Sequence, residues 1–116
     1  MKRIISICLV ALFCSCEAIF VENISDKNVK VIAPVNGSEI AAGIVNFSWE
    51  KVKDADEYQL QIVSPDFTNA NTIMVDTVIN KTFHTKELVA GDYEWRIKAM
   101  NSEYETNYTI NTLKIN

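Results

Sequence analysis

The chain has 116 residues, of which 48% are hydrophobic, and its formal net charge is −4. This length suits one domain with a single core, and a content of only three glycines and two prolines argues against a disordered or collagen-like chain. An acidic chain without a basic stripe binds polyanions poorly, so nucleic acid is not an expected partner.

The N-terminus has the outline of a secretion signal. Lys2 and Arg3 give a positive start, the apolar run Ile4–Phe13 follows, and a small residue precedes Cys16. The apolar run is much shorter than the roughly 20 residues that a membrane-spanning helix needs. We therefore expect residues 1–15 to be a signal peptide. Its removal would change the formal net charge to about −6, because both cations and no acid are lost.

The residues at the expected cleavage site, Phe13-Cys14-Ser15-Cys16, resemble the lipobox of bacterial lipoproteins. In that family signal peptidase II cuts before a cysteine that carries diacylglycerol, so the resemblance implies lipidation of Cys16 and a membrane as partner. The alternative is an ordinary cleaved signal followed by an incidental cysteine. Cys14 is a poorer lipid site, because bulky Phe13 would then occupy the small position before the cut.

Residues 16–28 are expected to comprise the lipidated cysteine and a flexible tether. The stretch from Glu17 to Asn28 is mostly polar and shows no sustained period. Its twelve residues would reach about 40 Å when fully extended. Alternatively, Ile19, Phe20 and Val21 could lie at the lipid surface.

From residue 29 onward the chain alternates apolar and polar residues in short runs. The clearest run is Gly91–Met100, in which Tyr93, Trp95 and Ile97 share one parity and the charged residues share the other. A strand this apolar on one side needs a second sheet to cover it. The expected strands are Val29–Ala33, Ile44–Trp49, Tyr58–Ile62, Thr72–Val78, Thr82–Thr85, Gly91–Met100 and Asn107–Ile115.

Seven short strands with regular turn signals and no helical period predict an all-β, antiparallel sandwich over residues 29–116. In the last strand Ile110 and the pair Leu113 and Ile115 have opposite parities, which a bulge near Asn111 or Thr112 would reconcile. The expected core is Val31, Val45, Phe47, Trp49, Tyr58, Leu60, Ile62, Ile73, Val75, Phe83, Leu88, Tyr93, Trp95, Ile97 and Ile110.

This pattern resembles a fibronectin type III domain, an immunoglobulin-like β-sandwich, and in particular the versions common in lipoproteins of Bacteroidetes. The resemblance is carried by Trp49, Tyr58–Ile62, Leu88 and Gly91–Ala99, and it covers about Val29–Asn116. In that family a tyrosine at the start of the sixth strand makes a corner by hydrogen bonding back to the chain upstream. The resemblance implies this role for Tyr93, shortly after Leu88.

A further resemblance concerns the covalent modification of proteins in these bacteria. Asp76-Thr77-Val78 resembles the short Asp-Ser/Thr-apolar site that they use for O-glycosylation, which makes Thr77 a candidate acceptor. The family's fold itself implies little about function, since such sandwiches serve many unrelated roles.

Catalysis and metal binding find little support in the sequence. Past Cys16 there is no cysteine for a metal site, a disulfide or nucleophilic catalysis. His84 is the only histidine, and its expected parity is outward, opposite to Phe83. Asp54, Asp56 and Glu57 cluster before the third strand but lack the spacing of a calcium loop, so a solvated acidic turn is the preferred interpretation. We expect no enzyme activity, no cofactor and no metal.

Three aromatic residues in or beside polar loops, Phe67, Tyr104 and Tyr108, are the candidate ligand contacts. Rings beside amides and carboxylates offer stacking together with hydrogen bonds to sugars or protein partners. The alternative is that Phe67 folds back over the end of the sandwich while the tyrosines lie flat on the sheet.

These observations predict a non-catalytic binding or adhesion module, anchored by lipid at the outer membrane or cell surface of a Gram-negative bacterium. The expected ligand is a glycan or an envelope protein. The alternative is a structural accessory subunit of an outer-membrane complex, such as a nutrient-uptake assembly.

Overall fold

The structure is a computed structural model, and it describes residues 20–116. Every regular element in this part of the chain is a strand, so it contains no helix that could span a bilayer. The strands are β1 (Val31–Ala33), β2 (Ser38–Ile40), β3 (Gly43–Trp49), β4 (Glu57–Ser64), β5 (Thr72–Ile79), β6 (Phe83–Leu88), β7 (Gly91–Met100) and β8 (Thr109–Ile115).

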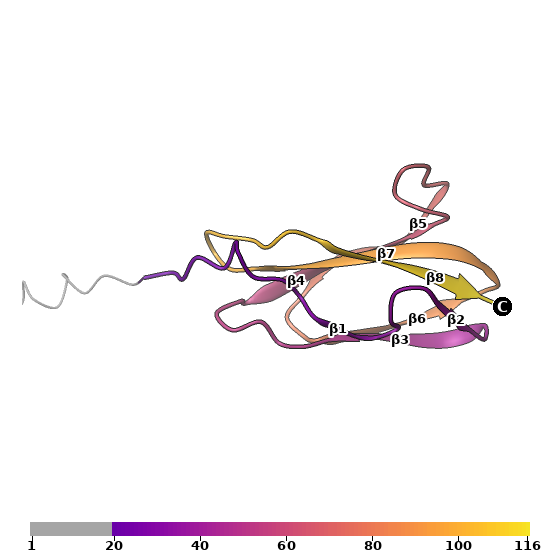
Figure 1. Cartoon of the computed structure of the whole chain (residues 1–116), viewed down its shortest axis with the longest axis horizontal. Helices are drawn as coiled ribbons and strands as arrows, with labels where there is room; N and C mark the ends of the chain where they lie inside the picture. The colour runs from indigo at the N-terminus through magenta and orange to yellow at the C-terminus, as the bar shows by residue number, and fades with distance from the viewer. Residues whose placement is uncertain (1–19) are drawn as a thin grey trace, which may run out of the picture.

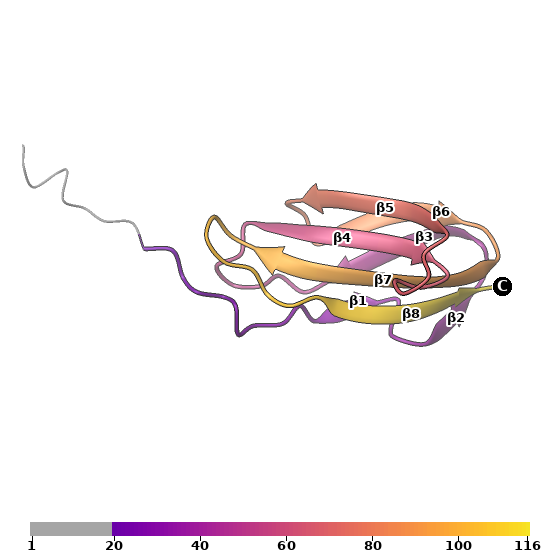
Figure 2. The same cartoon turned by 90° about the horizontal axis from the view of Figure 1, so that it is seen from above.

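The strands form two stacked sheets, one of three strands in the order β1-β3-β6 and one of five in the order β2-β8-β7-β4-β5 (Figure 1). Figure 2 shows β5, β4, β7 and β8 side by side in the larger sheet. Neighbouring strands are antiparallel except β2 and β8, which are parallel. The predicted all-β sandwich is confirmed, with eight strands where seven were expected.

The additional strand is β2, which pairs Ser38 with Leu113 and Ile40 with Ile115. In the sequence this region shows only a turn signal, and three residues are too few to display an alternation. Because β1 belongs to the smaller sheet and β2 to the larger, the chain changes sheets between them. The short strand β2 thereby covers the edge that β8 would otherwise expose.

The core lies between the sheets and is centred on β7. Trp95 of the larger sheet meets Phe47 of the smaller sheet edge to face, with ring centroids 5.0 Å apart and 75° between the ring planes. Such a pair adds about 0.5–1.5 kcal/mol to the contribution of burial. The predicted core residues that are buried are Val45, Phe47, Trp49, Tyr58, Leu60, Ile62, Leu88, Tyr93, Trp95 and Ile97, while Val31 and Val75 pack against them partly buried.

Three predicted core residues, Ile73, Phe83 and Ile110, are instead exposed, by 67%, 50% and 51%. Strand β8 alternates without the predicted bulge, so Asn111 takes the inner position opposite Trp95 and Ile110 faces solvent. The prediction was wrong because it assumed that the bulkier apolar residue must point inward.

Strand β6 has the parity opposite to the predicted one. His84 pairs with buried Phe47 and lies half-buried on the inner side, whereas Phe83 pairs with Ser48 on the outer side. The one-residue shift in the larger sheet occurs between β4 and β5, where it places Ile73 opposite Val63 on the outer side. A short strand with one large apolar residue carries too little pattern to fix its orientation.

The segment before β1 is docked on the sandwich from Glu22 onward. Ile24 is 0% exposed and belongs to the core cluster, and Val29 is also buried. The Ile24 carbonyl accepts a hydrogen bond from the Lys27 N–H at 2.9 Å, which closes a turn. The folded body therefore begins before Val29, the first residue of the predicted domain, because a single apolar residue in a polar stretch leaves no periodic signal.

The connection between β6 and β7 contains the geometry of a tyrosine corner. The Tyr93 hydroxyl donates to the Val89 carbonyl, four residues upstream, at 2.8 Å. Leu88, which ends β6 immediately before this connection, is buried. This hydrogen bond is the one that the fibronectin type III resemblance implies for Tyr93.

Candidate binding face

The outer face of the five-stranded sheet, the side turned away from the core, carries a group of one arginine and two aromatic rings. Arg96 Cζ lies 4.0 Å from the ring centroid of Phe67 and 4.2 Å from that of Tyr108. Phe67 comes from the β4–β5 loop, Arg96 from β7, and Tyr108 from the residue before β8. All three are half-buried. We call them the arginine–aromatic cluster.

The alternation and register of β7 bring the cluster together. Trp95 and Ile97 point into the core, so Arg96 between them must point outward. Arg96 lies opposite Gln61 on β4 and Ile110 on β8. Strands β4 and β8 therefore flank the guanidinium. Phe67 approaches it from the loop after β4, and Tyr108 from the residue before β8.

The loop that carries Phe67 is fixed to β7 by hydrogen bonds. The Phe67 N–H donates to Glu94 Oε1 at 2.9 Å, and the Ser64 hydroxyl donates to the Asp92 carbonyl at 2.7 Å. Within the loop the Asn69 N–H donates to Asp66 Oδ1 at 2.7 Å. These contacts hold the Phe67 ring over Arg96 without occupying the guanidinium.

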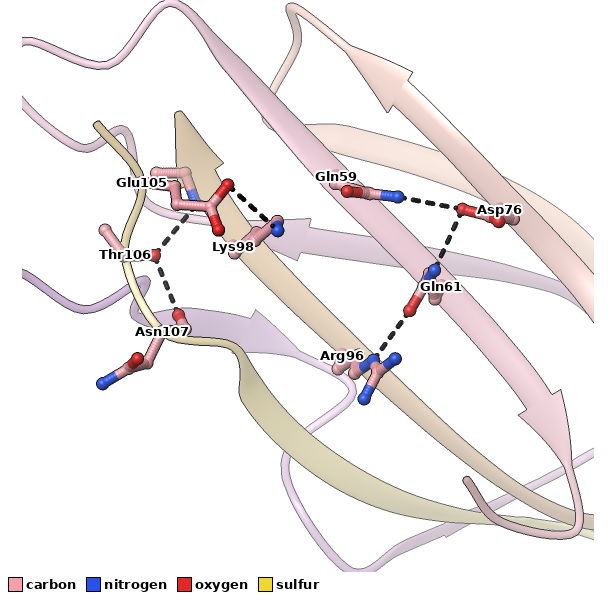
Figure 3. Close-up of polar contacts among 9 residues, drawn as sticks. Gln59, Gln61, Asp76, Arg96, Lys98, Glu105, Thr106 and Asn107 are labelled. Carbon is pink, nitrogen blue, oxygen red and sulfur yellow. Dashed lines mark hydrogen bonds and ion pairs between the residues drawn. The ribbon is translucent and has the colours of Figure 1, made fainter. Parts of the chain in front are cut away.

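A row of polar side chains runs from Arg96 across β4 to β5 (Figure 3). Arg96 Nε donates to Gln61 Oε1 at 2.7 Å, and Gln61 Nε2 donates to Asp76 Oδ1 at 3.1 Å. Gln59 Nε2 donates to the same Asp76 oxygen at 3.1 Å. The hydrogen bonds from Gln61 and then Gln59 lower the pKa of the Asp76 carboxyl, so Asp76 stays ionised at neutral pH.

Among residues 20–116 the single ion pair joins Lys98 Nζ and Glu105 Oε2, 3.2 Å apart (Figure 3). Lys98 Nζ also lies 4.8 Å from the Tyr108 ring centroid. In the same part of the chain, Arg96 makes one side-chain hydrogen bond, through Nε. The four N–H groups on its two terminal nitrogens are therefore available to a ligand.

A groove of about 490 Å³ adjoins the cluster at the end of the sandwich away from the N-terminal segment. Its lining includes the acidic residues Glu39, Asp66, Asp92 and Glu94 and the basic residue Lys114. Since Asp66 belongs to the Phe67 loop and Glu94 binds that loop, the groove and the cluster share a wall. Carboxylate oxygens in such a wall can accept hydrogen bonds from ligand hydroxyl groups.

Of the three aromatic residues predicted to contact a ligand, the structure brings Phe67 and Tyr108 together and leaves Tyr104 apart. Tyr104 packs against the core, and its N–H donates to Asn101 Oδ1 at 2.8 Å in the loop after β7. Arg96 was not among the residues predicted to contact a ligand. Its outward parity was visible, but its position between two rings follows from strand register.

The other singled-out residues lie away from this cluster or outside the described part. Thr77, the candidate O-glycosylation site, is half-buried opposite Leu60 on the inner side of β5. Cys16, the candidate lipidation site, lies outside residues 20–116. Within that part of the chain no group of three or more His, Cys, Asp or Glu side chains is arranged to hold a metal ion.

Comparisons with protein-family models and with curated proteins both find no match. Among solved structures, the chain is similar to the fn3 domain of the human collagen alpha-1(XX) chain, with 12% identity and a TM-score of 0.57 over 78% of this chain and 88% of that one. It is also similar to an Fn3-like protein from Clostridium thermocellum, with 14% identity and a TM-score of 0.51 over 77% and 88%.

A third similar structure is that of the CbhA fibronectin(III)-like modules of Clostridium thermocellum, with 15% identity and a TM-score of 0.51 over 75% of this chain and 93% of that one. At such low identity these similarities concern the fold alone. Together with the order of strands in the two sheets, they show that the chain folds as a fibronectin type III-like domain.

Proposed function

We propose that the protein is a lipid-anchored, non-catalytic binding module of a bacterial envelope, and that it holds an acidic glycan on the outer face of its five-stranded sheet. The observation that carries the proposal is the arginine–aromatic cluster. It presents a guanidinium with four available N–H groups between two partly exposed rings. A fibronectin type III-like fold supplies a rigid sheet on which such a cluster can be held.

The chemistry of the cluster favours a sugar that carries a carboxylate. A guanidinium binds a carboxylate through two parallel hydrogen bonds, while Phe67 and Tyr108 offer stacking surface to the sugar ring. Neither Glu94 nor Asp76 forms an ion pair with Arg96. The Glu94 carboxylate accepts from the Phe67 N–H and that of Asp76 from two glutamines. The Arg96 charge acts on Asp76 only through a weaker Coulombic attraction. An envelope protein would have to supply the same groups, an acidic side chain beside an apolar surface.

Binding is tested on a column of immobilised galacturonic acid, a sugar with a single carboxylate, with its methyl ester as the matched neutral probe. We expect the protein to be retained on the acidic form only. Replacement Arg96→Met should weaken this retention by roughly ten- to a hundredfold, since a charge-assisted hydrogen bond contributes about 1.5–3 kcal/mol.

Lys81→Met serves as the control, because Lys81 is an exposed cation in the connection between β5 and β6, outside both the cluster and the groove that adjoins it. Circular dichroism should show the same spectrum for all three proteins. Equal retention on both sugars, or unchanged retention of Arg96→Met, would remove the case for an acidic glycan at this cluster.

The anchoring half of the proposal is tested by metabolic labelling with a palmitate analogue in the native host. Cys16→Ser should abolish the label and release the protein from the membrane fraction, because two or more acyl chains are needed for a stable anchor. Cys14→Ser should keep both the label and the membrane location. A label that persists in Cys16→Ser would disprove the assignment of the lipid to this cysteine.

A further inference from the structure

The point at which the N-terminal segment joins the folded body is fixed by the loop after β7. Asn101 Nδ2 donates to the Glu22 carbonyl at 2.8 Å and to the Asp54 carbonyl at 3.1 Å. Two residues further on, Ile24 is fully buried. The chain is thus attached to this end of the sandwich from Glu22 onward (Figure 1).

This attachment limits how far the sandwich can stand from a lipid on Cys16. Five residues separate Cys16 from Glu22. The six steps from Cys16 to Glu22, at about 3.3–3.6 Å each, span at most roughly 20–22 Å when fully extended. The end of the sandwich that carries Asn101 would therefore stay close to the membrane, where the surface potential acts over a Debye length of about 8–10 Å.

Charges of opposite sign predominate at the ends of the two sheets here. A groove of about 340 Å³ is lined by Lys27, Lys30, Lys51 and Lys53 together with Glu50. It lies at the end of the three-stranded sheet, because the Glu50 N–H donates to the Lys30 carbonyl at 2.8 Å and so extends the β1–β3 pairing. Lys27 Nζ donates to the Lys53 carbonyl at 3.3 Å. We call this feature the lysine groove.

Three acidic groups at the same end lie beside the five-stranded sheet. Glu22, Asp54 and Asp56 line a second groove with Asn101. The Asp56 N–H donates to the Met100 carbonyl at 2.8 Å, so this groove continues the β4–β7 pairing. An anionic surface would therefore attract the end of the smaller sheet and repel the end of the larger one.

We propose that the lysine groove binds the anionic headgroups of the membrane that holds Cys16, so that the three-stranded sheet faces the membrane surface. The inference rests on the proposed lipid anchor. Ile32 and Phe83, exposed on the outer side of that sheet, would add apolar contact with the interface. In this orientation the outer face of the five-stranded sheet, with the arginine–aromatic cluster, points away from the membrane.

The test uses the full lipidated protein, purified from its host and reconstituted into vesicles of phosphatidylcholine alone or with phosphatidylglycerol. After flotation, lysines are acetylated with an N-hydroxysuccinimide ester, and the rate at each lysine is followed by mass spectrometry. We expect the lysine-groove residues to react roughly threefold or more slowly on the anionic vesicles, given the attraction of each basic residue to such a surface. Lys114, at the opposite end, should react equally on both.

The double variant Lys51→Gln/Lys53→Gln provides a second measurement. It should bring the rates at Lys27 and Lys30 on anionic vesicles back toward those on neutral vesicles, and 1 M salt should do the same in the unmodified protein. Flotation with both vesicles but equal lysine rates on both would overturn the orientation and leave the anchor intact. A protein that floats with neither vesicle would instead refute the lipid anchor and, with it, this inference.

Discussion

Trp95→Ala should lower the free energy of unfolding by about 3–5 kcal/mol, the range for deletion of a large buried aromatic side chain. Trp95 is 0% exposed and contacts the Phe47 ring edge to face. A small domain has a total stability of only about 5–15 kcal/mol. The variant should therefore be largely unfolded or should melt far below the parent, as measured by urea or thermal denaturation followed by circular dichroism.

Phe83→Ala is the matched control for this prediction. It also deletes an aromatic ring from a strand, but Phe83 is half exposed on the outer side of β6. Removal of a solvent-facing side chain changes stability by about 0.5 kcal/mol or less. If Phe83→Ala were as destabilising as Trp95→Ala, the assignment of inner and outer faces in the smaller sheet would be incorrect.

The fold was accessible from the sequence because period-two alternation directly reports which side of a strand is buried. In β7 every second residue from Tyr93 to Ala99 is buried, as the pattern predicts. A strand with one apolar face requires a second sheet to cover that face, and the shorter alternating segments of the sequence form this sheet. The sandwich architecture and seven of the eight strands follow from this alternation, whereas β2 is too short to be recognised by it.

The orientation of weakly patterned strands could not be obtained in this way. In β8 either Ile110 or Asn111 could face the core opposite Trp95. The register with β7 places Asn111 there. The decision depends on how the whole strand aligns with its neighbour, since Leu113 and Ile115 are buried with the same parity as Asn111. Local hydrophobicity alone favours the opposite choice.

The same limit applies to the candidate binding face. Phe67 and Tyr108 attract attention as aromatic residues near polar loops, but Arg96 looks like any outward residue of an alternating strand. Its place between the two rings depends on the pairing of β7 with both β4 and β8 and on the hydrogen bond that Glu94 accepts from the Phe67 N–H. Contacts of this kind join distant parts of the sequence and leave no motif.

Ile24→Ala should lower the free energy of unfolding by about 2–5 kcal/mol, as expected when a buried isoleucine is truncated. Ile24 is as fully buried as Trp95, although it lies in a stretch that resembles a tether in composition. Chemical denaturation followed by circular dichroism measures the loss. Phe20→Ala, four residues earlier at a side chain that is 86% exposed, is the control and should leave stability unchanged.

The measured stability of Ile24→Ala shows where the folded body begins, and hence how close the sandwich is held to the membrane. With Ile24 buried and the Glu22 carbonyl bound by Asn101, only the five residues after Cys16 can act as a spacer. If Ile24→Ala matched the parent protein in stability, the segment before Val29 would be a free tether of about 40 Å, long enough for the sandwich to rotate above the bilayer. The lysine groove would then have no fixed distance from the lipid, and its orienting effect would be lost.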